Sequence, residues 1–155
     1  MRESPTAIVL ANEEQTQQFA KRLAPAIQIP LNLSCRGDLG TGKSTLVRAL
    51  LRELGVTGPI KSPTFSLVES YPLSGGLWAH HFDLYRIDDE SELDVIGFRD
   101  YFTFNALCCI EWPERAGGRL PPMDVDFYLR HQGSGRLLEI SFMSPSGLKL
   151  KPFLI

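Results

Sequence analysis

The segment Gly37–Ser44 has the residue types and the spacing of a phosphate-binding loop. It reads Gly-Asp-Leu-Gly-Thr-Gly-Lys-Ser, which satisfies the pattern G-x-x-x-x-G-K-[ST]. In such a loop the glycines let backbone N–H groups curl around a triphosphate, Lys43 bridges the outer phosphates, and the hydroxyl of Ser44 ligates magnesium. The sequence therefore predicts a site for a nucleoside triphosphate with magnesium.

Two carboxylates are candidates to complete this site. Asp83 and Glu111 each come directly after an apolar run of strand length, and ligands of open α/β sheets bind at the carboxyl ends of the strands. We therefore expect both acids at the same edge of the sheet as the phosphate loop, where one or both would act on the metal and the attacking water. The alternative is that each forms a surface ion pair, with Arg86 or Arg115.

Two nearby patterns predict no chemistry. His80 and His81 adjoin Asp83, but successive strand residues point to opposite faces, which favours core or hydrogen-bonding roles over a metal site. The segment Asp94–Gly97 reads DxxG, yet no apolar strand precedes it and the chain has no NKxD motif for guanine, so we interpret it as a coincidence.

The elements that must position these residues alternate between strands and helices. A strand precedes the loop and an amphipathic helix follows it from Lys43, ending at Gly55. Asn12 is the expected N-cap of an earlier helix. The predicted strands are Ala7–Leu10, Leu31–Cys35, Ser66–Tyr71, Leu77–Phe82, Ala106–Ile110, a C-terminal hairpin of residues 125–142 and an edge strand Leu148–Leu154; the predicted helices are Glu13–Leu23, residues 43–54 and Asp88–Asp94. Aromatic residues at 98, 101, 102 and 104 are expected to pack inward.

Composition limits the class of protein. The chain has 155 residues, 43% hydrophobic and 22% charged, with a net charge of -2, so we expect one globular domain over residues 1–155 and no general affinity for nucleic acid. The first ten residues resemble no signal peptide, and no apolar run is long enough to span a membrane. The three cysteines lack metal-site spacing, which favours reduced, buried thiols in a soluble, cytoplasmic protein.

Four linked motifs make the chain resemble one known family. They are GDLGTGKST from Gly37, SPTF from Ser62, HFDLYR from His81 and IEWPE from Ile110, and in order and spacing they resemble the TsaE (YjeE) family. The resemblance implies a small bacterial P-loop ATPase required for threonylcarbamoyladenosine (t6A) modification of tRNA. It also implies an α/β, P-loop NTPase-like three-layer fold, in which a mostly parallel central sheet is extended by antiparallel strands and flanked by helices.

The same resemblance assigns roles to individual residues. It implies ATP and Mg²⁺ as ligands, with Lys43, Asp83 and Glu111 as catalytic residues and Ser44, Asp83 and Glu111 around the metal. It implies a switch-like segment at Ser62–Phe65. The implied nucleotide contacts are Asp38, Leu39, Gly40, Thr41, Gly42, Lys43, Ser44, Thr45, Thr64, Trp112 and, from a weaker local pattern near the adenine, Thr16.

The function that follows is an ATP-hydrolysing accessory subunit. The family resemblance implies TsaD and TsaB as partners, weak hydrolysis by the subunit alone, and contact with tRNA only through those partners. Two alternatives remain open: a small-metabolite kinase, which the absence of an arginine cluster after Ser62 disfavours, and a nucleotide-dependent interaction switch.

Overall fold

A twisted seven-stranded sheet organises the protein. The computed structural model describes residues 4–155, so residues 1–3 of the predicted 1–155 domain lie outside it. The strands are β1 (Thr6–Leu10), β2 (Leu31–Arg36), β3 (Val68–Pro72), β4 (Trp78–Asp83), β5 (Ala106–Glu111), β6 (Val125–Gln132) and β7 (Gly135–Phe142). Their order is β1-β7-β6-β2-β5-β4-β3. The four central strands run parallel, whereas β3, β7 and β1 pair antiparallel, which confirms the predicted α/β sheet.

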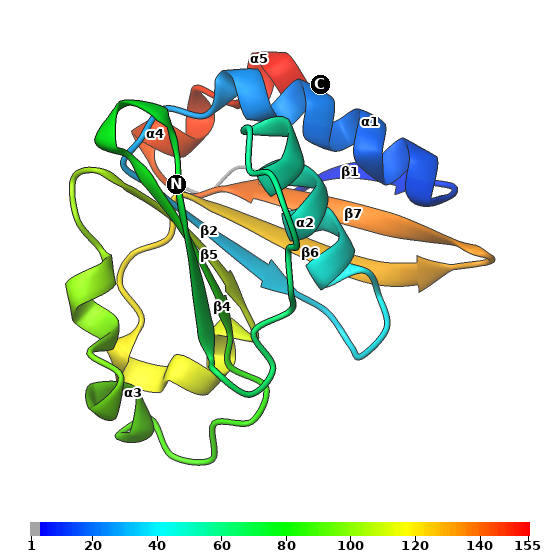
Figure 1. Ribbon diagram of the computed structural model, residues 1–155. Coiled ribbons are helices and arrows are strands. Elements are labelled where there is room, and N and C mark those ends of the chain that lie inside the picture. The colour runs from blue at the N-terminus through cyan, green and yellow to red at the C-terminus, as the bar shows by residue number, and fades with distance from the viewer. Residues whose placement is uncertain (1–3) are drawn as a thin grey trace.

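Helices cover the two faces unequally (Figure 1). The helices α1 (Glu13–Leu23), α2 (Lys43–Glu53), α4 (Pro145–Leu148) and α5 (Lys151–Leu154) gather on one side, while α3 (Glu92–Val95) lies apart, near β4. Short 3-10 segments accompany them at Ala24–Ala26, Ser74–Gly76, Phe98–Tyr101 and Pro113–Arg119. As predicted, Asn12 caps α1, because its side chain accepts a hydrogen bond from the Gln15 amide.

The alternation of side chains on the central strands produces two hydrophobic clusters. Leu33 and Cys35 of β2 face α1 and α2 in the larger cluster. Phe82 of β4 and Ile110 of β5 face the opposite side, where α3 and the neighbouring 3-10 segments cover them. Every residue of β5 is buried, as is typical of a continuous apolar run that forms an interior strand. All three cysteines are free and buried, as expected.

The predicted C-terminal strand is wrong. Residues 148–154 comprise the last residue of α4, a two-residue connection and the whole of α5, and form no sheet edge. Pro145 and Pro152 stand in the first turns of these helices, where a missing N–H costs nothing, and Ser144 caps the Gly147 amide. Leu150 and Leu154 are four residues apart and both buried, which is the helical period.

Two smaller predictions about the segment after β4 need correction. The acidic stretch Asp88–Asp94 forms a helix only at its end, within α3, because the carboxylate of Glu92 binds the Asp88 and Asp89 amides in a turn. Of the four aromatic residues expected to pack inward, Phe104 is 84% exposed. Phe98, Tyr101 and Phe102 pack in the cluster that contains Phe82, and Phe104 comes two residues after the last of them.

Candidate functional site

The loop between β2 and α2 is shaped for an anion. Gly37 has φ +144°, and a Cβ there would lie 2.4 Å from the Leu129 carbonyl oxygen and 2.7 Å from Thr41 Oγ1, so the position requires glycine. Gly42 begins α2 in a left-handed conformation, with φ 98° and no side-chain cap. The first amides of this eleven-residue helix are therefore left available to an anionic group.

Lys43 is buried against the loop. Only 5% of the residue is exposed, and its Nζ donates to the carbonyl oxygens of Gly37 at 2.7 Å and Asp38 at 2.8 Å. The same Nζ lies 4.4 Å from the centroid of the Trp112 ring. Burial lowers the pKa of Lys43, while the nearby Glu111 carboxylate opposes that shift. The low exposure of Lys43 follows from its contacts with two loop carbonyl oxygens and with the Trp112 ring.

Glu111 lies at the centre of a buried hydrogen-bond network. The residue is 2% exposed, and Ser44 Oγ lies 2.8 Å from each of its carboxylate oxygens. On the other side, His81 Nε2 lies 2.5 Å from Glu111 Oε2. Because an ionised carboxylate can only accept, this nitrogen carries the hydrogen. His81 is fully buried, and its Nδ1 has no partner among residues 4–155.

Asp83 lies beside Glu111 because the parallel strands β4 and β5 pair these two residues directly. Its Oδ1 accepts the Tyr85 amide at 3.1 Å, and burial raises the pKa of the Asp83 carboxyl. The alternative of surface ion pairs fails. Arg86 lies over the ring of Phe65, and Arg115 donates to the Ile87 carbonyl oxygen.

A cavity of about 430 Å³ opens in front of these groups. It brings together ten of the residues proposed from sequence: Leu39, Gly40, Gly42, Lys43, Ser44, Thr45, Thr64, Asp83, Glu111 and Trp112. Trp112 has a left-handed backbone, with φ 56°, and its ring contacts Tyr85 at 5.0 Å between centroids. A strained backbone of this kind is common where a side chain must be aimed at a ligand.

The remaining proposed contacts lie beside this cavity. Thr16 and Thr41 line a second cavity of about 170 Å³, which shares Gly42 and Thr45 with the first. Asp38 lines neither cavity and instead contributes its carbonyl oxygen to Lys43 and to Thr41. Both cavities thus border the start of α2, at Gly42 and Thr45.

Sequence reasoning missed three residues of this region. Arg136, at the start of β7, donates to the Thr41 carbonyl oxygen at 3.0 Å and to that of Gly40 at 3.1 Å, and it lines both cavities. Arg86 and Tyr85 line the larger one. Arg136 is 93 residues from the lysine of the motif, so no local pattern could identify it. Arg86 stood in a quoted motif but was considered only as an ion-pair partner.

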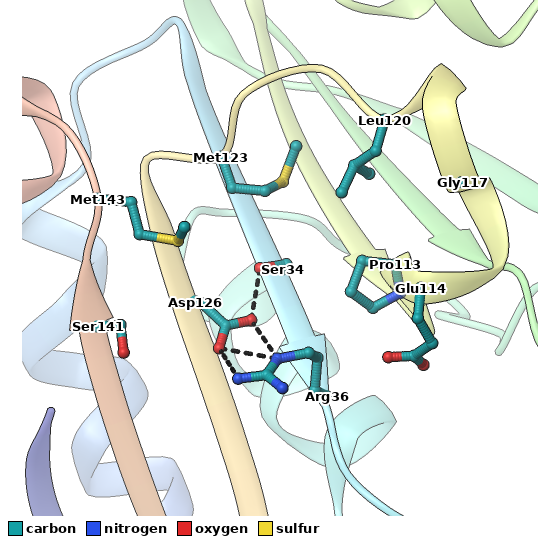
Figure 2. Close-up of a pocket in the computed structure, with 10 residues that line it drawn as sticks. All are labelled: Ser34, Arg36, Pro113, Glu114, Gly117, Leu120, Met123, Asp126, Ser141 and Met143. Atoms are coloured by element: carbon teal, nitrogen blue, oxygen red, sulfur yellow. Dashed lines mark hydrogen bonds and ion pairs between the residues drawn. The ribbon is translucent and has the colours of Figure 1, made fainter. Parts of the chain in front are cut away.

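A cavity of about 410 Å³ opens on the opposite face of the sheet, from which Arg36 and Asp126 project (Figure 2). Ser34 Oγ donates to Asp126 Oδ1 at 2.7 Å, and Arg36 Nη2 donates to Oδ2 at 2.7 Å. Both carboxylate oxygens are thus occupied, and the wall beyond is largely apolar, with Met123 and Met143. None of the candidate site residues identified from sequence lines this cavity.

Comparison with known proteins identifies a family that matches most of the chain. A family model described as "Threonylcarbamoyl adenosine biosynthesis protein TsaE" matches residues 10–138. This range contains the loop, both carboxylates and Arg136, and it ends before the C-terminal helices.

Individual relatives extend the match. A Haemophilus influenzae protein named tRNA threonylcarbamoyladenosine biosynthesis protein TsaE is 44% identical over 115 residues, which is 74% of this chain and 70% of that protein. A Bacillus subtilis protein of the same name is 34% identical, over 84% and 80% of the two chains. The crystal structure of Bacillus subtilis YdiB superposes with a TM-score of 0.81 at 26% identity and covers 99% of this chain and 95% of its own. With its phosphate loop, its paired carboxylates and a family match over most of its length, the chain belongs to the TsaE family.

Proposed function

We propose that this chain binds ATP with Mg²⁺ and hydrolyses the γ-phosphate as an accessory subunit in t6A modification of tRNA. The t6A role is supported by the names of its relatives. The observation that carries the hydrolytic part is the contact between Ser44 Oγ and both oxygens of Glu111, at 2.8 Å, at the first turn of α2. It joins the motif's metal-binding hydroxyl to a carboxylate that could orient water. We further propose that residues 1–155 form one such domain.

The donor groups at this edge suit magnesium. Ser44, Asp83 and Glu111 offer hard oxygen ligands, which Mg²⁺ prefers over nitrogen or sulfur. Residues 4–155 contain no cluster of three His, Cys, Asp or Glu side chains for a metal, and Mg²⁺ in nucleotide sites commonly uses one or two carboxylates together with substrate phosphates. When bound, the ion would neutralise charge on the β- and γ-phosphates.

The chain's own groups have separate tasks in this proposal. The amides at the start of α2 and the Lys43 ammonium hold the phosphates, once Lys43 exchanges the loop carbonyls for phosphate oxygens. Glu111, held by His81, orients the attacking water. In this proposal Thr16, which lines the smaller cavity, lies near the adenine, and Trp112, which lines the larger one, lies beside the nucleotide.

Phosphate release from ATP tests the proposal. The full chain should release phosphate in a magnesium-dependent reaction, and addition of TsaD and TsaB should accelerate it. Lys43→Ala should abolish release, because it removes the cation of the loop, whereas Lys21→Ala, an exposed lysine in the last turn of α1, should leave it unchanged. Equal release by Lys43→Ala and the unmodified chain would reject the assignment.

The interaction-switch alternative has support from one observation. Thr64 lines the phosphate cavity, while the next residue, Phe65, is 85% exposed. A segment that touches both the nucleotide and the surface could report the γ-phosphate to a partner. In that case ATP and ADP should give different affinities for the TsaD–TsaB complex, and Thr64→Ala should remove the difference. Equal affinities with the two nucleotides would reject the switch.

A further inference from the structure

One arginine of the phosphate cavity is left without an ionic partner. Arg86 lines the cavity together with Lys43, Asp83 and Glu111, three residues after the end of β4. Arg136 is already bound to two carbonyl oxygens of the loop, and Lys43 to two others. Among residues 4–155 no carboxylate forms an ion pair with Arg86. Its one described contact is with an aromatic ring.

That ring belongs to Phe65, in the segment that follows Thr64 at the cavity. The guanidinium carbon of Arg86 lies 4.6 Å from the ring centroid of Phe65. Phe65 is 85% exposed, so the ring packs against little else and presents its face to the cation. A surface contact of this kind is weak, and its loss changes an equilibrium by about two- to fivefold. The ring can hold the guanidinium of Arg86 against its own face within the cavity wall, and a γ-phosphate can readily replace the ring as the partner of Arg86.

Hydrolysis of ATP builds up negative charge that a cation such as the Arg86 guanidinium can stabilise. The water oxygen bonds to the γ-phosphorus while the bond to the β–γ bridging oxygen breaks. The electron pair leaves on ADP and the proton of the water is released to solvent. Negative charge is spread over the transferring phosphoryl oxygens and the bridging oxygen, and P-loop hydrolases commonly place an arginine there. One arginine of the cavity, Arg86, has no ionic partner among the described residues and could meet this charge.

We propose that Arg86 is the catalytic arginine of this site, and that the Phe65 ring holds it outside the phosphates until the segment containing Thr64 and Phe65 moves. This inference rests on the proposed ATP hydrolysis. Arg86 takes no proton and contributes only positive charge in the transition state. Phe65 is a positioning residue, because it acts through Arg86. A partner that covers the exposed ring would release the arginine and accelerate turnover.

Steady-state kinetics of the full chain test both parts. Arg86→Ala should lower kcat by at least about 100-fold, and the KM for ATP should stay within about threefold, because the interaction forms only in the transition state. Arg86→Lys should restore little, since a point charge does not reproduce the fork of the guanidinium. The matched control is Arg22→Ala, which removes another arginine that lies over a phenylalanine, Phe19, at 5.7 Å, and that lines neither of the two cavities at the loop. It should leave kcat unchanged.

The effect of the ring depends on the arginine. Phe65→Leu keeps an apolar side chain but removes the aromatic face, and it should raise kcat about two- to fivefold. In the Arg86→Ala background the same change should have no effect. An equal gain in both backgrounds would overturn the positioning role of Phe65.

A binding measurement supplies a readout that is independent of turnover. Calorimetry should show that ADP with aluminium fluoride binds the unmodified chain more tightly than ADP alone. Arg86→Ala should bind ADP as the unmodified chain does, but aluminium fluoride should no longer increase its affinity. A kcat for Arg86→Ala within threefold of the unmodified chain, or an unchanged gain with aluminium fluoride, overturns the catalytic role. If Lys43→Ala is inactive while Arg86→Ala is fully active, only this inference fails. If Lys43→Ala is as active as the unmodified chain, the proposed function fails with it.

Discussion

His81→Leu tests whether the buried histidine holds the Glu111 carboxylate in place. The two side chains meet at 2.5 Å, and both are almost completely removed from solvent. Leucine fills a similar volume without a donor, so Glu111 keeps only its contact with Ser44. The substitution therefore deletes one charge-assisted hydrogen bond in a water-excluded place and creates no large cavity.

The expected cost follows from that single bond. A buried hydrogen bond to a charged group contributes about 1.5–3 kcal/mol to the free energy of unfolding. In a chain of this length 1 kcal/mol corresponds to about 2–4 °C in the midpoint of thermal unfolding, which predicts a fall of about 3–12 °C. Because the Nδ1 of His81 has no partner among the described residues, the substitution breaks no second hydrogen bond. Turnover should fall with it, through kcat, since the carboxylate loses its orientation.

Thermal and urea unfolding, followed by circular dichroism, measure the cost. The matched control is His80→Leu on the same strand, where the ring faces the other side and its Nδ1 meets Ser70 Oγ at 2.7 Å in an exposed, neutral hydrogen bond. We expect less than about 1 kcal/mol there. A His81→Leu protein as stable as the unmodified chain, or less damaged than His80→Leu, would contradict the proposed role of the histidine.

Three further predictions concern single groups. Asp83→Asn should stabilise the fold near pH 7 and abolish turnover. Burial raises the pKa of the Asp83 carboxyl, so the unmodified chain loses stability as the pH rises through that pKa, whereas the asparagine variant does not. In urea titrations at acidic pH, the difference in unfolding free energy between the two proteins should therefore vanish. Arg136→Ala should raise the KM for ATP with a smaller change in kcat, because the substitution frees the two loop carbonyl oxygens that the guanidinium holds. An unchanged KM would show that Arg136 does not hold the loop in its nucleotide-binding conformation. Burial raises the pKa of Cys108 to about 12, so iodoacetamide at pH 8 should alkylate this thiol slowly in the folded chain and fast in the unfolded chain. Mass spectrometry measures the two rates, and equal rates would mean that the thiol is accessible in the folded chain.

Local chemistry made part of the site predictable. The glycines, Lys43 and Ser44 stand in one continuous segment, and each is required by the chemistry of phosphate or metal. The loop conformation follows from the same residues, because φ +144° at Gly37 and the close Leu129 carbonyl exclude any side chain. Asp83 and Glu111 were identifiable because each ends an apolar run, and the carboxyl ends of parallel strands share one edge.

Contacts between distant segments were beyond local patterns. His81 has the sequence features of an ordinary strand residue, and only the pairing of β4 with β5 brings it to Glu111. Arg136 reaches the loop because β7 returns antiparallel beside β6. The burial of Lys43 depends equally on the left-handed turn at Trp112 after β5.

The C-terminal segment shows the same division. Leucines alternating with polar residues and prolines over 148–154 fit an edge strand as well as a helix start, and the packing of Leu150 and Leu154 into the core selects the helix. The sequence by itself determined the phosphate loop, the order of the strands up to β7 and the two carboxylates, because these depend on residue type and on periodicity within a few residues. Only the tertiary structure decided which side chains surround Glu111 and Lys43 and where Arg86 lies, because those contacts join segments tens of residues apart and depend on strand pairing.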